Sequence, residues 1–246
     1  MEILRQIIPT VNAVKKKFVA TKIILHTSPR RKNLCRPETF SRVIFMTLEN
    51  KFGIVDAAEL ARVEERISKR NALELFTSGR LENFQAGTFA TLAEIHRVLF
   101  GELYNFAGKL RTVNLFKGHF RFAAALYLAE AVAHVEKLPQ KNFDEIVTKY
   151  VEMNVAHPFR EGNGRSMRIW LDHIFKTEIN RVVDWSRVDK TKYLSAMELS
   201  PIHDASIKKI LAAALTDKVT DREIFMKGID ASYFYENYFA YRTRDL

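Results

Sequence analysis

The side chains best suited to phosphate chemistry lie together in the run HPFREGNGRSMR, from His157 to Arg168. Arg165 and Arg168 are three positions apart, and the planar fork of arginine suits phosphate oxygens. Glu161 offers a hard oxygen for Mg²⁺, which usually binds through one or two carboxylates plus substrate phosphates. His157 is a group whose ordinary pKa suits proton abstraction near neutral pH. Together these residue types describe a phosphate-transfer site.

Two glycines indicate that this run leads into the start of a helix. Gly162 and Gly164 permit backbone angles and close approaches that side chains would forbid, and apolar spacing predicts a helix that carries Met167 and Trp170. The first free N–H groups of such a helix form an anion site. Two arginines at a helix start are unfavourable for the helix dipole unless an anion offsets them. Each residue taken alone fits an ordinary surface turn, but the combination favours a bound phosphate.

The surrounding elements are predicted to be helical. Apolar periodicity predicts seven or eight helices, and His96 lies beside one apolar face, where we expect a packing residue rather than a ligand. Two β-favouring runs between residues 111 and 122 predict one small hairpin. One hairpin among so many helices indicates an all-α fold. The clearest helix starts and stops are the caps Asp56, Thr88 and either Asn142 or Asp144, and a helix from about Ala123 to before Pro139.

Composition and charge limit the class of protein. The chain has 246 residues, of which 47% are hydrophobic and 28% charged, which excludes a disordered chain or a fibre. No run approaches the roughly 20 apolar residues of a membrane span, and a lone Cys35 indicates a reducing, cytoplasmic compartment. Residues 1–45 hold ten Lys or Arg against two acidic residues, so they carry +8 of the net charge of +10. We expect a weakly ordered basic extension over 1–45 and one domain over 46–246, with a nucleic-acid-binding or nucleotide-sensing module as the non-enzyme alternative.

The run from His157 resembles the signature of the Fic family, H-x-F-x-[DE]-G-N-G-R-x-x-R, at every specified position. The resemblance extends from about Asn50 to the C-terminus and leaves residues 1–45 outside. It implies an all-α Fic fold with a β-hairpin flap over the active site, and transfer of AMP from ATP to a hydroxyl side chain of a target protein. The matching residues are His157, Phe159, Glu161, Gly162, Asn163, Gly164, Arg165 and Arg168.

The resemblance also implies a role for each of these residues. His157 would be the base that deprotonates a Tyr, Ser or Thr of the target, and Glu161 would hold Mg²⁺ against the α- and β-phosphates. Phe159 would be a core anchor for the loop. The anion hole and the outer phosphates would be bound by Gly162, Asn163, Gly164, Arg165 and Arg168.

The hairpin would be the target-docking flap of the family. Its edge would pair with an extended target segment through main-chain hydrogen bonds, a mode that tolerates varied target sequences. Compact bacterial relatives can target type II topoisomerases and can change oligomeric state, so a topoisomerase partner and a homo-oligomer are expectations from the resemblance. The flap residues are Leu115, Phe116, Lys117, Gly118, His119 and Phe120.

The transferred group is also inferred from the resemblance. Members that phosphorylate their targets carry Lys where this chain has Gly164, so Gly164 favours adenylyl transfer. Relatives that transfer UMP or phosphocholine keep similar loops, and transfer of such a group stays as the alternative.

The run SYFYEN, which starts at Ser232, resembles the family's inhibitory motif [ST]-x-x-x-E-[GN]. We expect an inhibitory helix at about 229–240, on which Ser232 and Glu236 share one face. Glu236 would then pair with Arg168 and occupy the guanidinium that the γ-phosphate needs. An aromatic packing helix is the alternative, and both descriptions can hold. The candidate sites of self-modification are Tyr233 and Tyr235.

Overall fold

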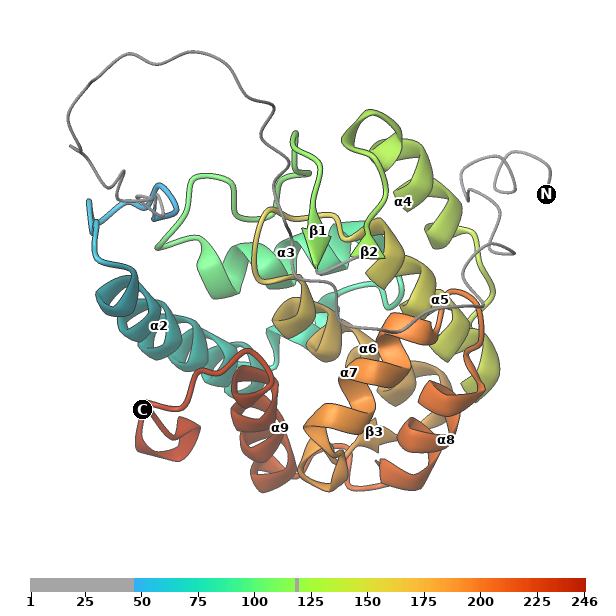
Figure 1. Ribbon diagram of the computed structural model, residues 1–246. Helices are drawn as coiled ribbons and strands as arrows, with labels where there is room; N and C mark the ends of the chain where they lie inside the picture. Colours follow the sequence, from blue (N-terminus) through green and yellow to red (C-terminus); the bar gives the residue numbers. More distant parts are fainter. Residues whose placement is uncertain (1–46, 118–119) are drawn as a thin grey trace, which may run out of the picture. The chain divides into compact units, whose positions relative to one another are not determined.

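The computed structural model describes residues 47–117 and 120–246, and these form an all-α fold (Figure 1). The predicted fold class is confirmed, while the predicted extension over 1–45 lies outside the described residues. Among the described helices, none combines the length and the apolarity that a membrane span requires. The α-helices are α2 (Ala57–Thr77), α3 (Phe89–Phe100), α4 (Leu128–Glu136), α5 (Phe143–Ala156), α6 (Asn163–Ile179), α7 (Lys190–Leu199), α8 (Ala205–Ala214) and α9 (Arg222–Phe234).

Side-chain caps define the starts of five of these helices, which are α2, α3, α5, α7 and α9. Asp56 accepts from the N–H of the residue three positions on at 2.7 Å, and Thr88 and Asn142 do the same for α3 and α5. The prediction that a helix begins near Ala123 is wrong, because a 3₁₀ turn precedes α4, which begins at Leu128. The N–H of Ala123 donates instead to the end of α5 at 3.0 Å, so this segment leaves the hairpin in extended form.

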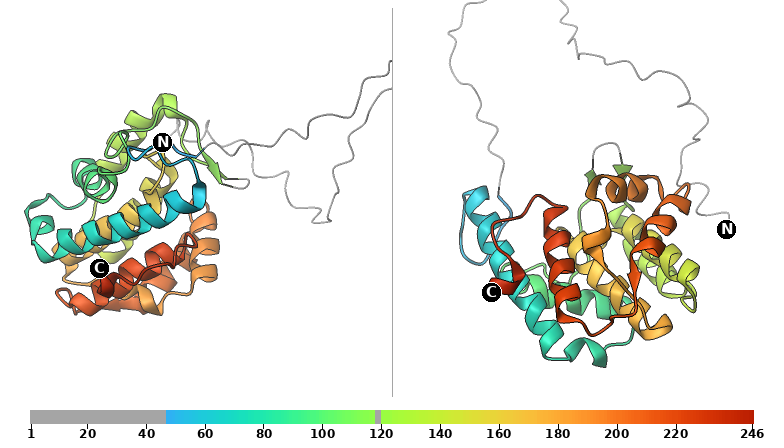
Figure 2. Two further views of the ribbon diagram at one scale, coloured as in Figure 1. Left: turned by 90° about the vertical axis from the view of Figure 1, so that its left-hand side faces the viewer. Right: turned by 90° about the horizontal axis from the view of Figure 1, so that it is seen from below.

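Helix α6 forms the centre of the fold. It packs against α3, α5 and α9, and α2 and α9 lie side by side in both views of Figure 2. Its core-facing side chains are fully buried, which matches the predicted apolar stripe. These side chains include Trp170, Leu171, Ile174 and Phe175.

Two short antiparallel strand pairs complete the described part of the fold. Strand β1 (Phe116–Lys117) pairs with β2 (Phe120–Arg121), which confirms the predicted hairpin, although its residues 118 and 119 lie outside the described residues. Strand β3 (Val182–Val183) pairs with β4 (Leu215–Thr216), and this ladder was not predicted. Strands of two residues carry no alternation of apolar and polar side chains that a sequence could reveal.

The predicted inhibitory helix at about 229–240 has different bounds. Helix α9 begins well before this range and ends at Phe234. Asn237 has φ 67°, the N–H of Tyr238 donates to Tyr233 O at 3.0 Å, and the N–H of Asn237 donates to the carbonyl of Phe234 at 3.0 Å. These bonds form a Schellman motif, which ends a helix by a left-handed residue. The helix therefore cannot continue to residue 240.

Candidate functional site

The loop that carries the signature is closed tightly by backbone geometry. His157 ends α5 with a left-handed φ of 49°, and its N–H donates to the carbonyl of Met153 at 2.9 Å. Gly162 precedes α6 with φ 74°, and a Cβ there would lie 2.4 Å from the ring of Phe100. A side chain at residue 162 would therefore meet both backbone strain and a steric clash.

Asn163 and Phe159 hold the middle of this loop together. The Asn163 side-chain oxygen accepts from the Phe159 N–H at 2.8 Å, and its amide nitrogen donates to the Phe159 carbonyl at 2.7 Å. Phe159 is fully buried, as expected for a core anchor. Because the amide of Asn163 is used in this way, its contribution to an anion hole would come from its backbone N–H at the start of α6.

His96 supports the loop from beneath. Its Nδ1 accepts from the N–H of Gly108 at 2.9 Å, so Nε2 carries the proton and donates to the carbonyl of Glu161 at 2.8 Å. Burial lowers the pKa of His96 to about 3, and its ring packs 3.9 Å from that of Phe159. His96 is a neutral packing residue with both nitrogens satisfied, which confirms the expectation from its position.

Arg165 is buried and lies close to three carboxylates, those of Glu64, Glu161 and Glu236. Its Nη1 lies 2.5 Å from Oε1 of Glu64 on α2, and its Nη2 lies 3.1 Å from Oε1 of Glu161. The other oxygen of Glu64 accepts from the hydroxyl of Tyr104. Burial disfavours the charged form of Arg165, but the charges of Glu64 and Glu236 outweigh it and raise the pKa. These carboxylates supply the negative charge that the arginines at the helix start require.

Glu64 is a residue of the site that no motif in the sequence indicates. It is 2% exposed and follows Leu60 by four positions on the buried face of α2. An acidic residue on a core-facing stripe is the signal that could have found it, because buried carboxylates are almost always paired.

Arg168 contacts the predicted inhibitory motif. Its Nε donates to Ser232 Oγ at 2.6 Å, and its Nη2 donates to the carbonyl of the same residue at 2.9 Å. Glu236 places Oε1 at 3.4 Å from Nη2 of Arg168 and Oε2 at 3.4 Å from Nε of Arg165. Burial raises the pKa of Glu236, but the two arginines lower it more, so the net shift is downward. Ser232 and Glu236 thus share one side although Glu236 lies beyond the last residue of α9.

Glu236 also lies directly over the glycine loop. A Cβ built on Gly164 would come 2.8 Å from Oε1 of Glu236. The carboxylate therefore occupies the space next to the first turn of α6, where the resemblance places the anion.

The two tyrosines proposed for self-modification are buried in this conformation. The Tyr235 hydroxyl donates to the carbonyl of Val188 at 2.9 Å, and Tyr233 is almost fully buried. Each ring lies 5.2 Å from a guanidinium, Tyr233 from that of Arg165 and Tyr235 from that of Arg168. Aromatic packing and contact with the arginines therefore coexist on this segment.

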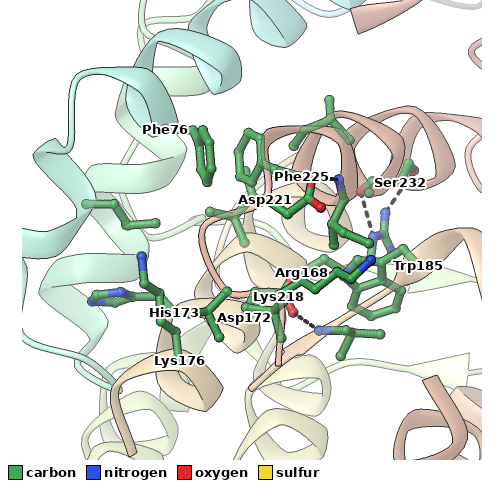
Figure 3. Close-up of a pocket in the computed structure, with 18 of the residues that line it drawn as sticks. Phe76, Arg168, Asp172, His173, Lys176, Trp185, Lys218, Asp221, Phe225 and Ser232 are labelled. Atoms are coloured by element: carbon green, nitrogen blue, oxygen red, sulfur yellow. Dashed lines mark hydrogen bonds between the residues drawn. The ribbon is translucent and has the colours of Figure 1, made fainter. Parts of the chain in front are cut away.

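A cavity of about 60 Å³ lies beside the contact of Arg168 with Ser232 (Figure 3). Phe76 and Phe225 line it from α2 and α9. Asp172 on α6 also lines it, and its carboxylate accepts from the N–H of Val183 and the indole N–H of Trp185, each at 2.8 Å. Burial raises the pKa of Asp172 to about 7. Helix α9 is thus incompletely packed on the core at the place where it meets Arg168.

The ring of His157 packs against the residue that follows β2. It stacks on Phe122 with ring centres 3.6 Å apart, and Nδ1 lies 3.3 Å from the carbonyl of Asn154. Burial lowers the pKa of His157 to about 4, so the ring is neutral at physiological pH. A proton on Nδ1 donated to Asn154 leaves the lone pair on Nε2, where a base needs it.

Glu161 is the one residue of the signature with an acidic side chain, and it is partly open to solvent. Its Oε1 accepts from the N–H of Gly162 at 2.9 Å and from Arg165, while the side chain is 40% exposed. Burial and neighbouring carboxylates raise the pKa of Glu161, although Arg165 opposes them. The described residues contain no cluster of three or more metal-ligating side chains. A Mg²⁺ ion would therefore depend on this carboxylate together with phosphates and water, as is usual for Mg²⁺.

The chain is similar in sequence and in structure to proteins named as adenylyltransferases or as Fic-domain effectors. The chain is 32% identical over 158 residues to protein adenylyltransferase VbhT of Bartonella schoenbuchensis, which covers 60% of this chain but only 32% of that protein. It is 29% identical over 177 residues to the probable protein adenylyltransferase y4lH of Sinorhizobium fredii, covering 67% of this chain and 85% of that protein. The structure of BepC from Bartonella tribocorum with bound AMPPNP superposes with a TM-score of 0.58 at 19% identity, over 69% of this chain and 92% of that one.

The family match covers the signature loop and the elements next to it in the chain. The match to the Fic/DOC family spans residues 87–175, which include α3, the flap, the signature loop and most of α6. Residues 87–175 of this chain therefore match the Fic/DOC family, and the described residues have the all-α fold of the Fic-domain structures.

Proposed function

We propose that this protein is a protein adenylyltransferase that transfers AMP from ATP to a Tyr, Ser or Thr hydroxyl of a target protein and is inhibited by its own Glu236. The observation that carries the proposal is the position of Glu236, whose carboxylate lies 3.4 Å from both arginines over a loop built for an anion. The relatives named protein adenylyltransferase and the nucleotide bound to BepC support the same activity.

Each residue of the signature has a separate role in the proposed reaction. The backbone at the start of α6 and the guanidinium of Arg168 hold the phosphates. Nε2 of His157 takes the proton of the target hydroxyl as its oxygen attacks the α-phosphorus. The new bond joins that oxygen to phosphorus, the bond to the bridging oxygen breaks, and pyrophosphate leaves with that oxygen. Mg²⁺, held by Glu161, would neutralise charge on the phosphates when bound.

Autoinhibition follows from competition for Arg168. In the described conformation this guanidinium is shared by Ser232 and Glu236, so the outer phosphates of ATP cannot reach it without displacing the carboxylate. A like-charge contact between Glu236 and a phosphate would be strongly unfavourable in this buried place. ATP would then sit in a pose that is wrong for in-line attack, and positioning is most of the catalysis in such transfers.

The test is label transfer from α-³²P-ATP and Mg²⁺ to the protein itself and to lysate proteins. We expect Glu236→Gly to raise incorporation at least about tenfold, since releasing one buried charge contact of about 1.4 kcal/mol corresponds to a factor of ten. Glu223→Gly, which removes an exposed carboxylate at the start of α9, is the matched control and should resemble the parent. Equal labelling by the parent and Glu236→Gly would contradict autoinhibition.

Two further experiments test the role of His157 and the identity of the nucleotide donor. His157→Ala in the Glu236→Gly background should lose transfer while it still binds ATP. Comparing ATP, UTP, GTP and CDP-choline as donors distinguishes adenylyl transfer from the related transfers of UMP or phosphocholine. Mass spectrometry of the labelled lysate identifies the target, and a purified type II topoisomerase is a direct acceptor to include.

A further inference from the structure

Arg111 is a buried arginine outside the signature. It lies between α3 and β1 and is 5% exposed. Within the described residues it forms no ion pair with a carboxylate. Burial of a cation without a counter-charge is expensive unless hydrogen bonds replace its hydration. The burial lowers the pKa of Arg111, but a guanidinium stays charged in proteins.

The guanidinium of Arg111 donates to four backbone carbonyls from two parts of the fold. Nη1 donates to Val113 at 2.7 Å and Nη2 to Ala123 at 2.5 Å, and these residues stand just before and just after the flap. Nε donates to His157 at 2.8 Å and Nη2 also donates to Ala156 at 3.1 Å, at the end of α5. One side chain therefore joins both ends of the flap to the residue that carries the base.

The end of α5 explains why a cation is stable here. The last carbonyls of a helix lack partners within the helix and carry partial negative charge. Capping of α5 would need only the bonds to Ala156 and His157. The bonds to Val113 and Ala123 go beyond that requirement, because they fix two segments that contain no helix.

Other contacts link the segments on either side of the flap to the base and its neighbours. The ring of Phe122 stacks on that of His157 at 3.6 Å. The N–H of Ala123 donates to the carbonyl of Val155 at 3.0 Å, and the N–H of Arg111 donates to that of Pro158 at 2.9 Å. His157 has a left-handed backbone that costs energy for a non-glycine residue, so its position depends on these neighbours.

We propose that Arg111 is a positioning residue that holds the flap and His157 in one register, so that a hydroxyl presented along the flap edge meets Nε2 of the base. The inference rests on the proposed transferase activity. It assigns to Arg111 an effect on transfer to protein acceptors and none on ATP binding, because no hydrogen bond of Arg111 goes to α6 or to residues 161–164.

The test compares Arg111→Lys and Arg111→Met in the Glu236→Gly background. Lysine keeps the charge but cannot span four carbonyls, so we expect transfer to lysate proteins to fall about tenfold, and about a hundredfold in Arg111→Met, as for a displaced catalytic group. The affinity for ATP, measured by calorimetry, should stay within about twofold. Arg97→Met removes an exposed arginine that pairs with Glu94, and it is the matched control.

A pH profile separates positioning from general stability. Burial lowers the pKa of His157 most, and the charge of Arg111 lowers it further, while the other charged groups that face His157 are Glu236 and Lys117. In Arg111→Met the loss of this charge should raise the pKa of His157. The decline of the transfer rate at low pH, which is the acid limb of the pH profile, should then move to higher pH. Arg111→Lys, which keeps the charge, should shift the limb less. A purely structural defect would lower the rate without moving the limb.

The outcomes distinguish this inference from the proposed function. If Glu236→Gly itself labels no protein, the transferase proposal fails, and Arg111 has no reaction to position. Suppose instead that Glu236→Gly is active and that Arg111→Lys in this background has a Tm showing that it is folded. If it then transfers at the same rate, with the same decline of the rate at low pH, the inference about Arg111 is wrong. A parallel loss of ATP affinity in Arg111→Lys would also overturn it.

Discussion

Arg165 keeps its charge in the interior because carboxylates from three elements surround it. Glu64 comes from α2, Glu161 from the loop, and Glu236 from the segment after α9. Removing one partner of a buried ion pair leaves an uncompensated charge, which is far more destabilising than losing a surface pair. Of the three carboxylates, Glu64 is the most buried, so it carries the structural part of this network.

Glu64→Gln should therefore lower stability strongly. We expect a loss of about 3 kcal/mol in the free energy of unfolding, because the neutral amide leaves Arg165 with less compensation. Urea denaturation at pH 7 measures the change. Glu94→Gln removes the carboxylate that pairs with the exposed Arg80 and Arg97, and should cost less than about 1 kcal/mol. Equal losses in the two variants would contradict a structural role for Glu64.

The signature residues could be read from the sequence, but several of their partners could not. The motif gave His157, Glu161 and the arginines by their spacing. Glu64 and Arg111 contact this loop from positions far away in the chain, and no local pattern joins residues that meet only after folding. His96 was assigned as a packing residue from its place beside an apolar face, and the structure added its two hydrogen bonds.

At the scale of elements, helix α9 is fastened to α2 by a buried lysine. Nζ of Lys69 lies 2.9 Å from Glu65 and 3.0 Å from Asp230, and it donates to the carbonyl of Tyr241 at 2.6 Å. Asp230 also accepts from the N–H of Thr243 at 3.0 Å. These bonds tie both α9 and the C-terminal segment to α2, next to each other in Figure 2. They hold Glu236 in place without touching the loop.

Lys69→Met should weaken this attachment and raise transfer. If the variant destabilises the conformation in which Glu236 contacts the arginines by about 1.4 kcal/mol, label incorporation should rise about tenfold although Glu236 is intact. Hydrogen exchange of α9 should increase in the same variant. In the Glu236→Gly background, Lys69→Met should add nothing, because the carboxylate it positions is gone. Lys141→Met, at an exposed pair with Glu178, is the control, and an equal effect there would contradict the prediction.

Element types were easier to predict from sequence than element ends. Periodicity and caps predicted the helices and the flap hairpin, since each signal lies within one segment. The end of α9 was placed too late, although Asn237 is a residue type that often takes the left-handed position after a helix. The ladder of β3 and β4 joins residues more than thirty positions apart and depends on tertiary contact.

At the scale of the whole molecule, two buried neutral histidines make stability depend on pH. The folded pKa of His157 is about 4 and that of His96 about 3, both below the ordinary 6.5. As pH falls from about 6.5 towards 4, the unfolded chain binds protons that the folded chain does not, so both residues reduce stability. Asp172, with its pKa raised from 3.8 to about 7, acts in the opposite direction, because its contribution to stability is lost as pH rises from about 4 to about 7.

A variant isolates the contribution of His157. Asn tolerates a left-handed backbone, so His157→Asn should fold with a Tm close to that of the parent at pH 7.5. At pH 5 the variant should have the higher Tm, because it has no imidazole to protonate on unfolding. Thermal circular dichroism at the two pH values measures the difference. His203→Asn changes an exposed histidine and serves as control, and a difference in Tm between parent and His157→Asn that does not vary with pH would refute the argument.

The space next to Gly164 limits which substitutions evolution could accept at this position. Any larger residue at position 164 would drive out the carboxylate of Glu236, since even a Cβ would come within 2.8 Å of it. A larger residue at position 164 would therefore break the contact on which the proposed autoinhibition rests, and it would also change the shape of the loop beneath that contact. Substitution of Glu236 would remove the same contact and leave the loop unchanged.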